Sequence, residues 1–238
     1  MKHSENSIFA DNYAEKTRAN DEVNSEIKCI IDNEIKKHVL KTGEKPTVLD
    51  VGSAGLYLYN PDNIKQITML DIFPKPDNIK LTDNTEWLVG NILADDIKKA
   101  LPNREYDFII MSSLLHHLCD ANNKIIEHLR IAFSNSRGLL RGGGELLIFE
   151  STCPTLFCKI QDILYPFYSY FLVKLIKFAY VRMTCIKEIL RILEESNFQA
   201  DLMHIKQPKY ICMLFLKIPL KLTPLKINAI IAYPKEHY

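Results

Sequence analysis

The chain has 238 residues, of which 47% are hydrophobic and 25% are charged, as in an ordinary folded globular protein. This composition excludes a disordered tail, a collagen-like chain and a disulfide-rich scaffold. Lys and Arg number 30 and Asp and Glu 29, so the formal net charge of +1 does not indicate a nucleic-acid partner. The length fits one well-buried α/β domain with additions.

The cysteines indicate a reducing compartment. They include no Cys-x-x-Cys pair, which argues against a structural zinc site and a redox dithiol, so we expect buried, reduced thiols. The amino-terminal residues 1–7 lack the apolar core of a signal peptide. The longest stretches without a charged residue, 108–119 and 163–173, are shorter than the roughly 18 residues that span a bilayer. We therefore expect a cytoplasmic protein without a membrane-spanning segment. The six cysteines are Cys29, Cys119, Cys153, Cys158, Cys185 and Cys212.

In chain order, the first expected element is an N-terminal helix. Apolar residues recur at helical spacing from Val23 to Val39, and the pattern ends near Gly43 and Pro46. Short apolar runs follow, of the kind found in strands buried on both faces of a mainly parallel sheet. All eight glycines lie between Gly43 and Gly144, so we expect the functional site in that part of the chain. The five runs are 47–51, 67–70, 86–89, 108–111 and 145–149.

Helical patterns separate and follow these strands. Apolar spacing predicts a helix over 125–133, with Asp120 or Asn122 able to cap its start. This alternation favours an open, doubly wound α/β fold. Further on, Thr184 can cap a helix over 186–193. The runs 198–205 and 210–218 then predict a final antiparallel hairpin.

The segment 154–181 fits neither a strand nor a one-sided helix. Its apolar and aromatic residues cover more than one helical face, which is usual for a buried helix. Three interpretations stay open: an inserted helical pair packed on the core, a lid over a greasy substrate, or a contact with a membrane surface.

The strongest local signal is the run 48–55, a strand that ends in a turn of small residues. Such a turn lets the backbone approach a ligand closely. Asp71 follows Asp50 by 71 − 50 = 21 positions, at the end of the next strand, where a carboxylate can accept both hydroxyls of a ribose. The pair indicates an adenine nucleoside. The Gly-x-Gly-x-x-Gly spacing of dinucleotide-binding oxidoreductases is absent at Gly52, which disfavours that class.

Five segments in order resemble the class I S-adenosylmethionine-dependent methyltransferases, especially the small-molecule type whose fourth strand ends in Leu-His-His-Leu. They are 48–55, 70–72, 89–92, 106–118 and 140–148. The resemblance implies a Rossmann-like seven-stranded doubly wound sheet with an antiparallel C-terminal hairpin. It divides the chain into an N-terminal helical cap (1–45), a cofactor-binding core (46–152), an apolar helical insertion or lid (153–182), a last core helix with a strand hairpin (183–220) and a tail (221–238).

The resemblance also implies where S-adenosylmethionine binds. Its methionine part would lie against the turn after the first strand, its ribose on Asp71, its adenine beside the second and third strand ends, and its sulfonium near Ser112. The turn departs from the family's Gly-x-Gly-x-Gly, because the run Gly52-Ser53-Ala54-Gly55 reads as if one glycine after Ser53 had been lost. Pro61 also shortens the helix that should follow. The expected cofactor residues are Asp50, Gly52, Ser53, Gly55, Asp71, Ile72, Asn91, Ile92 and Ser112.

His116 and His117 close the fourth predicted strand. A histidine there could take a proton from the attacking acceptor, since its ordinary pKa is near 6.5. By resemblance, His117 would pair with Tyr13 of the N-terminal helix. Alignment of acceptor and cofactor in a dry pocket could also act without a base. A metal site built from His116, His117, Cys119 and Asp120 is disfavoured, since magnesium prefers oxygen ligands, and we predict no metal.

These features predict a methyltransferase for a small acceptor, with a lipophilic or aromatic acceptor favoured by the apolar segment 154–181. Neutral net charge disfavours a nucleic-acid substrate. The alternative is a catalytically impaired protein of the same fold that binds a partner or a membrane through 154–181. The oligomeric state stays open.

Overall fold

The computed structural model describes residues 21–101, 105–175, 179–203, 205–213 and 216–235. Seven strands form one sheet in the order β3-β2-β1-β4-β5-β9-β6. The first five pair in parallel, whereas β9 runs antiparallel to both β5 and β6. This is the predicted Rossmann-like α/β fold. The strands are β1 (Thr47–Val51), β2 (Gln66–Asp71), β3 (Thr85–Val89), β4 (Tyr106–Ser112), β5 (Leu140–Thr152), β6 (Phe198–Met203) and β9 (Lys226–Pro234).

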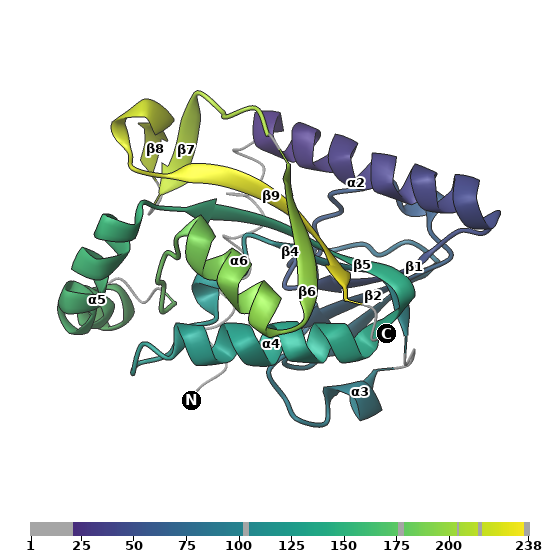
Figure 1. Ribbon diagram of the computed structural model, residues 1–238, viewed down its shortest axis with the longest axis horizontal. Coiled ribbons are helices and arrows are strands. Elements are labelled where there is room, and N and C mark those ends of the chain that lie inside the picture. Colours follow the sequence, from purple (N-terminus) through teal and green to yellow (C-terminus); the bar gives the residue numbers. More distant parts are fainter. Residues whose placement is uncertain (1–20, 102–104, 176–178, 204, 214–215, 236–238) are drawn as a thin grey trace.

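Helices cover both faces of the sheet, which is why the central strands are apolar on both sides. The predicted N-terminal helix is α2 (Asp21–Thr42), and it packs with Val48 and Phe108 on one face. On the other face, α4 (Ile125–Leu139) and α6 (Ile186–Glu195) pack with Leu49 and Ile109. Figure 1 shows α2 on the far side of the sheet from α4 and α6. A short helix, α3 (Ile97–Ala100), precedes β4.

The predicted position of the reversed strand was wrong. In the structure, β7 (Tyr210–Met213) and β8 (Leu216–Pro219) pair with each other in a separate two-stranded sheet, and a 3-10 helix, η5 (Leu220–Leu222), follows. The reversed strand is β9, in the region predicted as a tail, and it inserts between β5 and β6. Residues 229–232 of β9 are buried, so this apolar run occupies the position in the sheet between β5 and β6.

The connections agree with the sequence in part. Only a 3-10 helix, η2 (Pro61–Asn63), links β1 and β2, as the proline predicts. Asp120 accepts hydrogen bonds from the backbone N–H groups of Asn122 and Lys124, so it stabilises the turn into α4, although Lys124 occupies the N-cap. The predicted cap at Thr184 was wrong. Cys185 is the N-cap of α6, and Thr184 instead bridges to Thr152 beside the sheet.

Tertiary packing gathers cysteines that the sequence keeps apart. Cys153, Cys158 and Cys185 share a small apolar cluster, and the sulfurs of Cys153 and Cys158 are 3.0 Å apart. These three and Cys119 are buried free thiols as predicted, whereas Cys29 is exposed. Within the described ranges, no helix is long and apolar enough to cross a bilayer.

The inserted segment is helical. It forms α5 (Thr155–Tyr170), followed by a π-helical turn, η4 (Phe171–Leu175). Tyr165 on α5 donates a hydrogen bond to the carbonyl of Asp120 at 2.6 Å, and Tyr168 donates to the carbonyl of Val181 at 3.0 Å. These contacts hold α5 at the edge of the sheet where the parallel strands end.

Candidate functional site

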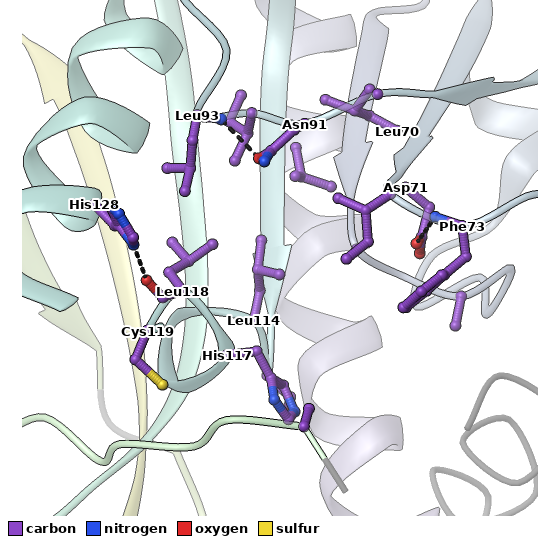
Figure 2. Close-up of a pocket in the computed structure, with 18 of the residues that line it drawn as sticks. Leu70, Asp71, Phe73, Asn91, Leu93, Leu114, His117, Leu118, Cys119 and His128 are labelled. Carbon is purple, nitrogen blue, oxygen red and sulfur yellow. Dashed lines mark hydrogen bonds between the residues drawn. The ribbon is translucent and has the colours of Figure 1, made fainter. Parts of the chain in front are cut away.

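A cavity of about 720 Å³ lies at the carboxyl ends of β1, β2 and β4. This volume lies within the range of small-molecule sites. Its wall includes Gly52 after β1, Asp71 at the end of β2, residues 90–93 after β3, and residues 113 and 114 with 117–119 after β4. Ligands of open α/β sheets bind at this edge, because the turns that leave parallel strands meet there. Figure 2 shows Asp71 and Phe73 on one side of the cavity and Cys119 and His128 on the other.

Asp71 is the carboxylate at this edge. One of its oxygens accepts a hydrogen bond from the backbone N–H of Phe73 at 3.0 Å, drawn in Figure 2. Burial raises the pKa of Asp71, while hydrogen bonds from the backbone of Phe73, Ala54 and Ile72 act in the opposite direction. A carboxylate has about four lone-pair positions, and the 3.0 Å hydrogen bond from Phe73 occupies one of them, so Asp71 keeps capacity for the two hydroxyls of a ribose.

The turn after β1 is closely packed. Gly52 has φ +70°, and a Cβ built there would lie 2.7 Å from a methyl carbon of Leu114. Its N–H donates to the carbonyl of Leu70 at 2.8 Å, which ties the turn to the end of β2. A side chain at this position would therefore strain the backbone and press on the cavity wall.

Two other cavity residues, Ala54 and Ser113, have φ +50° and +51° although neither is glycine. The left-handed conformation costs a residue with a Cβ roughly 1–2 kcal/mol. Such strain often accompanies functional sites.

The wall on the side of β2 and β3 carries several apolar and aromatic side chains. Ile72, Asn91 and Ile92, the predicted neighbours of the adenine, line it. Sequence reasoning missed Phe73 and Trp87, which lie there too. The indole N–H of Trp87 donates to the carbonyl of Phe73 at 3.1 Å and so holds the ring in place. A planar heterocycle such as a purine fits a wall of this kind.

The two neighbouring histidines have different environments. They lie in a 3-10 turn, η3 (Leu115–His117), directly after β4. Nδ1 of His116 is 2.8 Å from a carboxylate oxygen of the buried Glu150, whose other oxygen accepts the N–H of Leu115. His116 is absent from the cavity wall and holds the turn to β5, whereas His117 lines the cavity.

His117 is suited to accept a proton. Burial lowers its pKa well below the ordinary value, and the neighbouring His116 lowers it further, while a hydrogen bond with the backbone of Tyr180 raises it. The imidazole is therefore neutral at pH 7, the form that a general base requires.

The end of the cavity farther from Asp71 carries side chains that no motif indicated. Nδ1 of His128 is 2.6 Å from the carbonyl of Leu118. A carbonyl only accepts, so Nδ1 carries a proton, and in the neutral imidazole Nε2 keeps a lone pair. Cys119, Val173 and Lys174 also line the cavity. Cys119 follows η3, His128 lies on α4, and Val173 and Lys174 lie in η4, more than 40 residues further along the chain, so no spacing rule joins them.

Several predicted cofactor residues do not line this cavity: Asp50, Ser53, Gly55 and Ser112. Gly55 has φ +83° and packs against Ile79. Ser112 ends β4, and its neighbour Ser113 faces the cavity instead. Tyr13 lies outside the described residues, so its predicted pairing with His117 stays a prediction.

Asp50 is buried beneath the turn. Its carboxylate accepts a hydrogen bond from the hydroxyl of Tyr59 at 2.8 Å. Burial raises the pKa of Asp50 to about 7. The side chain shares the α2 side of the sheet with Val48 and Tyr59, because neighbouring residues of a strand point to opposite faces.

We expect Asp50→Asn to stabilise the protein above pH 7. A carboxyl whose folded pKa exceeds its unfolded pKa binds more protons when folded, so its contribution to stability is lost as pH rises from about 4 to 7. Asparagine keeps the acceptor for Tyr59 and does not ionise. Urea denaturation at pH 8 should give a gain on the order of 2–4 kcal/mol, with little change at pH 4. An equal effect at both pH values would contradict this assignment. Glu145, whose pKa burial also raises to about 7, keeps its own pH dependence in both proteins.

Within the described residues, no group of three or more His, Cys, Asp or Glu side chains is placed to hold a metal ion. Of the four candidate ligands, His116 contacts Glu150 and Asp120 accepts two backbone N–H groups. The thiol of Cys119 lies 3.6 Å from the carbonyl of His116.

No family model and no curated protein matches the chain. Among solved structures, it is similar to an S-adenosylmethionine-dependent methyltransferase from Methanosarcina mazei, with 16% identity, a TM-score of 0.51 and coverage of 81% of this chain and 94% of that one. It is also similar to the N-methyltransferase NodS from Bradyrhizobium japonicum, solved with S-adenosylhomocysteine. Here the identity is 14% and the TM-score 0.52, and the match covers 88% of this chain and 88% of that one. For the CurJ carbon methyltransferase, the identity is 17% and the TM-score 0.54, and the match covers 87% of this chain and 54% of that one. The chain therefore has the fold of the class I methyltransferases.

Proposed function

We propose that this protein transfers a methyl group from S-adenosylmethionine to a small lipophilic or aromatic acceptor. The observation that carries the proposal is one cavity that joins the Gly52 turn, the Asp71 carboxylate and the aromatic wall of Phe73 and Trp87. The fold shared with methyltransferases supports the same cofactor.

The residues present fit this cofactor. Asp71 would accept the ribose hydroxyls, and Ile72, Asn91 and Ile92 would lie beside the adenine. Gly52 lets the backbone approach the methionine part closely. When bound, the cofactor would supply a methyl group carried on a positively charged sulfur. An attacking O, N, C or S atom of the acceptor would bond to the methyl carbon as its bond to the sulfur breaks.

The acceptor would occupy the end lined by Leu114, Leu118 and Val173. These apolar side chains favour a lipophilic molecule and exclude water. His117, neutral at pH 7, would take the proton that a hydroxyl or amine loses on attack. Lys174 on the same wall could pair with an acidic group of the acceptor.

The first test is calorimetric titration with S-adenosylhomocysteine, for which we expect micromolar binding. The second is incubation with methyl-labelled cofactor and a panel of lipophilic phenols and carboxylic acids, followed by extraction of labelled product. Absence of cofactor-product binding in the folded protein would contradict the proposal.

The second candidate is a catalytically impaired binding module, favoured by the left-handed φ of Ala54 in a turn that, by the resemblance, lacks one of the family's glycines. We expect Ala54→Gly to change unfolding free energy by about 1 kcal/mol or less, because relief of strain and added chain entropy oppose each other. S-adenosylhomocysteine affinity should stay within a few-fold of wild type. Ala179→Gly, at a cavity alanine without positive φ, is the matched control. Binding that arises only in Ala54→Gly would favour the binding module.

A further inference from the structure

The outward face of α5 and η4 is a continuous exposed apolar stripe. Ile163 and Phe167 are each 75% exposed. Successive residues of the stripe are one or three positions apart, so they lie along one side of the helix. Monomeric soluble proteins rarely expose so large an apolar patch unless it contacts something. The stripe consists of Leu156, Phe157, Ile160, Ile163, Leu164, Phe167, Tyr170 and Phe171.

The opposite face of α5 is firmly packed. Tyr165 is 2% exposed and belongs to the main apolar core. Asp162 receives two hydrogen bonds from the guanidinium of Arg182, both at 2.9 Å, and Arg182 is itself buried. The helix is therefore held in this orientation, and the stripe is exposed by the fold.

Charge is segregated along the chain in a way that the net value of +1 hides. Residues 151–183, which include α5, contain four Lys and Arg and one Asp. Residues 202–235 contain six Lys and no Asp or Glu. Together they carry 10 − 1 = +9, and the remainder carries (30 − 10) − (29 − 1) = −8. The single acidic residue in these segments is Asp162, which is paired with Arg182.

The two basic segments meet around residues 220–225. Cys158 on α5 packs in one cluster with Leu220 and Leu225, which flank the exposed Lys221 and Leu222. Figure 1 shows α5 and the β7–β8 hairpin at the same end of the molecule. Leu222 is 73% exposed, so this region adds an apolar side chain beside lysines.

We propose that the stripe of α5 and η4 docks on an anionic lipid membrane, with the exposed Lys221 and Lys226 beside it on the headgroups. An amphipathic helix with an apolar face and basic surroundings lies in the plane of such a surface. Exposed aromatic residues of the stripe, such as Phe157 and Tyr170, suit the headgroup region. Clustered lysines attract anionic lipids electrostatically.

Docking would bring the cavity to the membrane. Val173 and Lys174 follow the stripe directly in η4 and line the cavity. Resting on the proposed function, this continuity indicates that the acceptor is an amphiphile taken from the lipid phase.

The test is vesicle flotation with the full chain, using phosphatidylcholine vesicles with and without phosphatidylglycerol. We expect binding to the anionic vesicles, weaker binding to pure phosphatidylcholine, and release at high salt. The double variant Ile163→Asp/Phe167→Asp should weaken binding about tenfold or more. The control is Leu40→Asp, because Leu40 is 77% exposed near the end of α2, away from α5 in Figure 1, and should leave binding unchanged.

Thermal denaturation and S-adenosylhomocysteine titration of each variant separate docking from folding and from the proposed function. A protein that binds S-adenosylhomocysteine but no anionic vesicle overturns the docking and leaves the function in place. Vesicle binding that survives the double substitution also overturns it. A third outcome overturns it as well: light scattering shows that the wild type is a homodimer and the double variant a monomer, and the wild type binds no vesicles. Vesicle binding without S-adenosylhomocysteine binding supports docking and contradicts only the function and the acceptor assignment.

Discussion

Asp71→Ala is expected to weaken S-adenosylhomocysteine binding by roughly 10- to 100-fold in calorimetric titration. A hydrogen bond to a charged group contributes about 1.5–3 kcal/mol, and each 1.4 kcal/mol is a factor of ten in affinity. Asp71 lies at the end of β2 in the cavity wall, oriented by the backbone N–H of Phe73. Losing its carboxylate removes the acceptor for the ribose hydroxyls.

Two further variants define this effect. Asp71→Asn keeps one acceptor oxygen and should give an intermediate loss. Asp83→Ala removes an exposed carboxylate elsewhere on the surface and should bind as wild type does. Equal affinity of wild type and Asp71→Ala would show that the ligand does not use this carboxylate.

The same residue predicts a pH dependence of binding. Burial raises the pKa of Asp71, so its carboxylate gains a proton at a higher pH than an exposed aspartate as the solution is acidified. Affinity for S-adenosylhomocysteine should therefore fall on acidification through that raised pKa, and Asp71→Ala should lack this part of the pH dependence.

His117→Gln is expected to lower turnover by about 10²- to 10⁴-fold while S-adenosylhomocysteine affinity stays unchanged. Glutamine can form hydrogen bonds but cannot take the proton of the attacking acceptor. His117 lies in the cavity wall away from Asp71, where the acceptor would bind. Turnover is measured with the acceptor that the phenol and acid panel identifies.

The pH profile supplies a second readout for His117. Because its pKa is lowered, the neutral base persists well below pH 6.5, and kcat/KM should stay flat from about pH 6.5 to 8. Activity should fall only when pH drops through the lowered pKa. An NMR titration of the ring, with His117→Gln to assign the signal, measures that pKa directly.

His128→Gln distinguishes the two histidines of the cavity. The Nδ1 proton of His128 is donated to Leu118, which leaves Nε2 as an acceptor. Normal turnover in His117→Gln together with a large loss in His128→Gln would transfer the role of base to His128. Normal turnover in both would show that alignment of acceptor and cofactor is sufficient.

Local sequence patterns predict the parallel strands of the fold but not the position of the reversed strand. The five parallel strands are predictable, because each contains a short apolar run between turn signals. All of them except the edge strand β3 are buried on both faces over that run. The runs at 210–219 and 226–234 are both apolar, so local pattern cannot tell which one pairs with β5 and β6. Long-range packing decides that β9 is the strand that pairs with β5 and β6.

The sequence likewise predicted some features of the candidate site correctly and others not. Spacing predicted that the Gly52 turn and Asp71 meet, since the carboxyl ends of neighbouring parallel strands share one edge. It misplaced Asp50, which alternates to the α2 side of the sheet and bonds Tyr59. It also grouped His116 with His117, although His116 contacts Glu150 outside the cavity wall.

The sequence by itself determined the fold class, the positions of the five parallel strands along the chain and the edge that holds Gly52, Asp71 and His117. These follow from hydrophobic runs and turns whose information is local. Only the tertiary structure decided that His128 and Lys174 reach the same cavity and that α5 turns its apolar stripe outward. The sequence of α5 is apolar around more than one face, and which face is covered depends on the segments that pack against it, here those of Asp120, Val181 and Arg182.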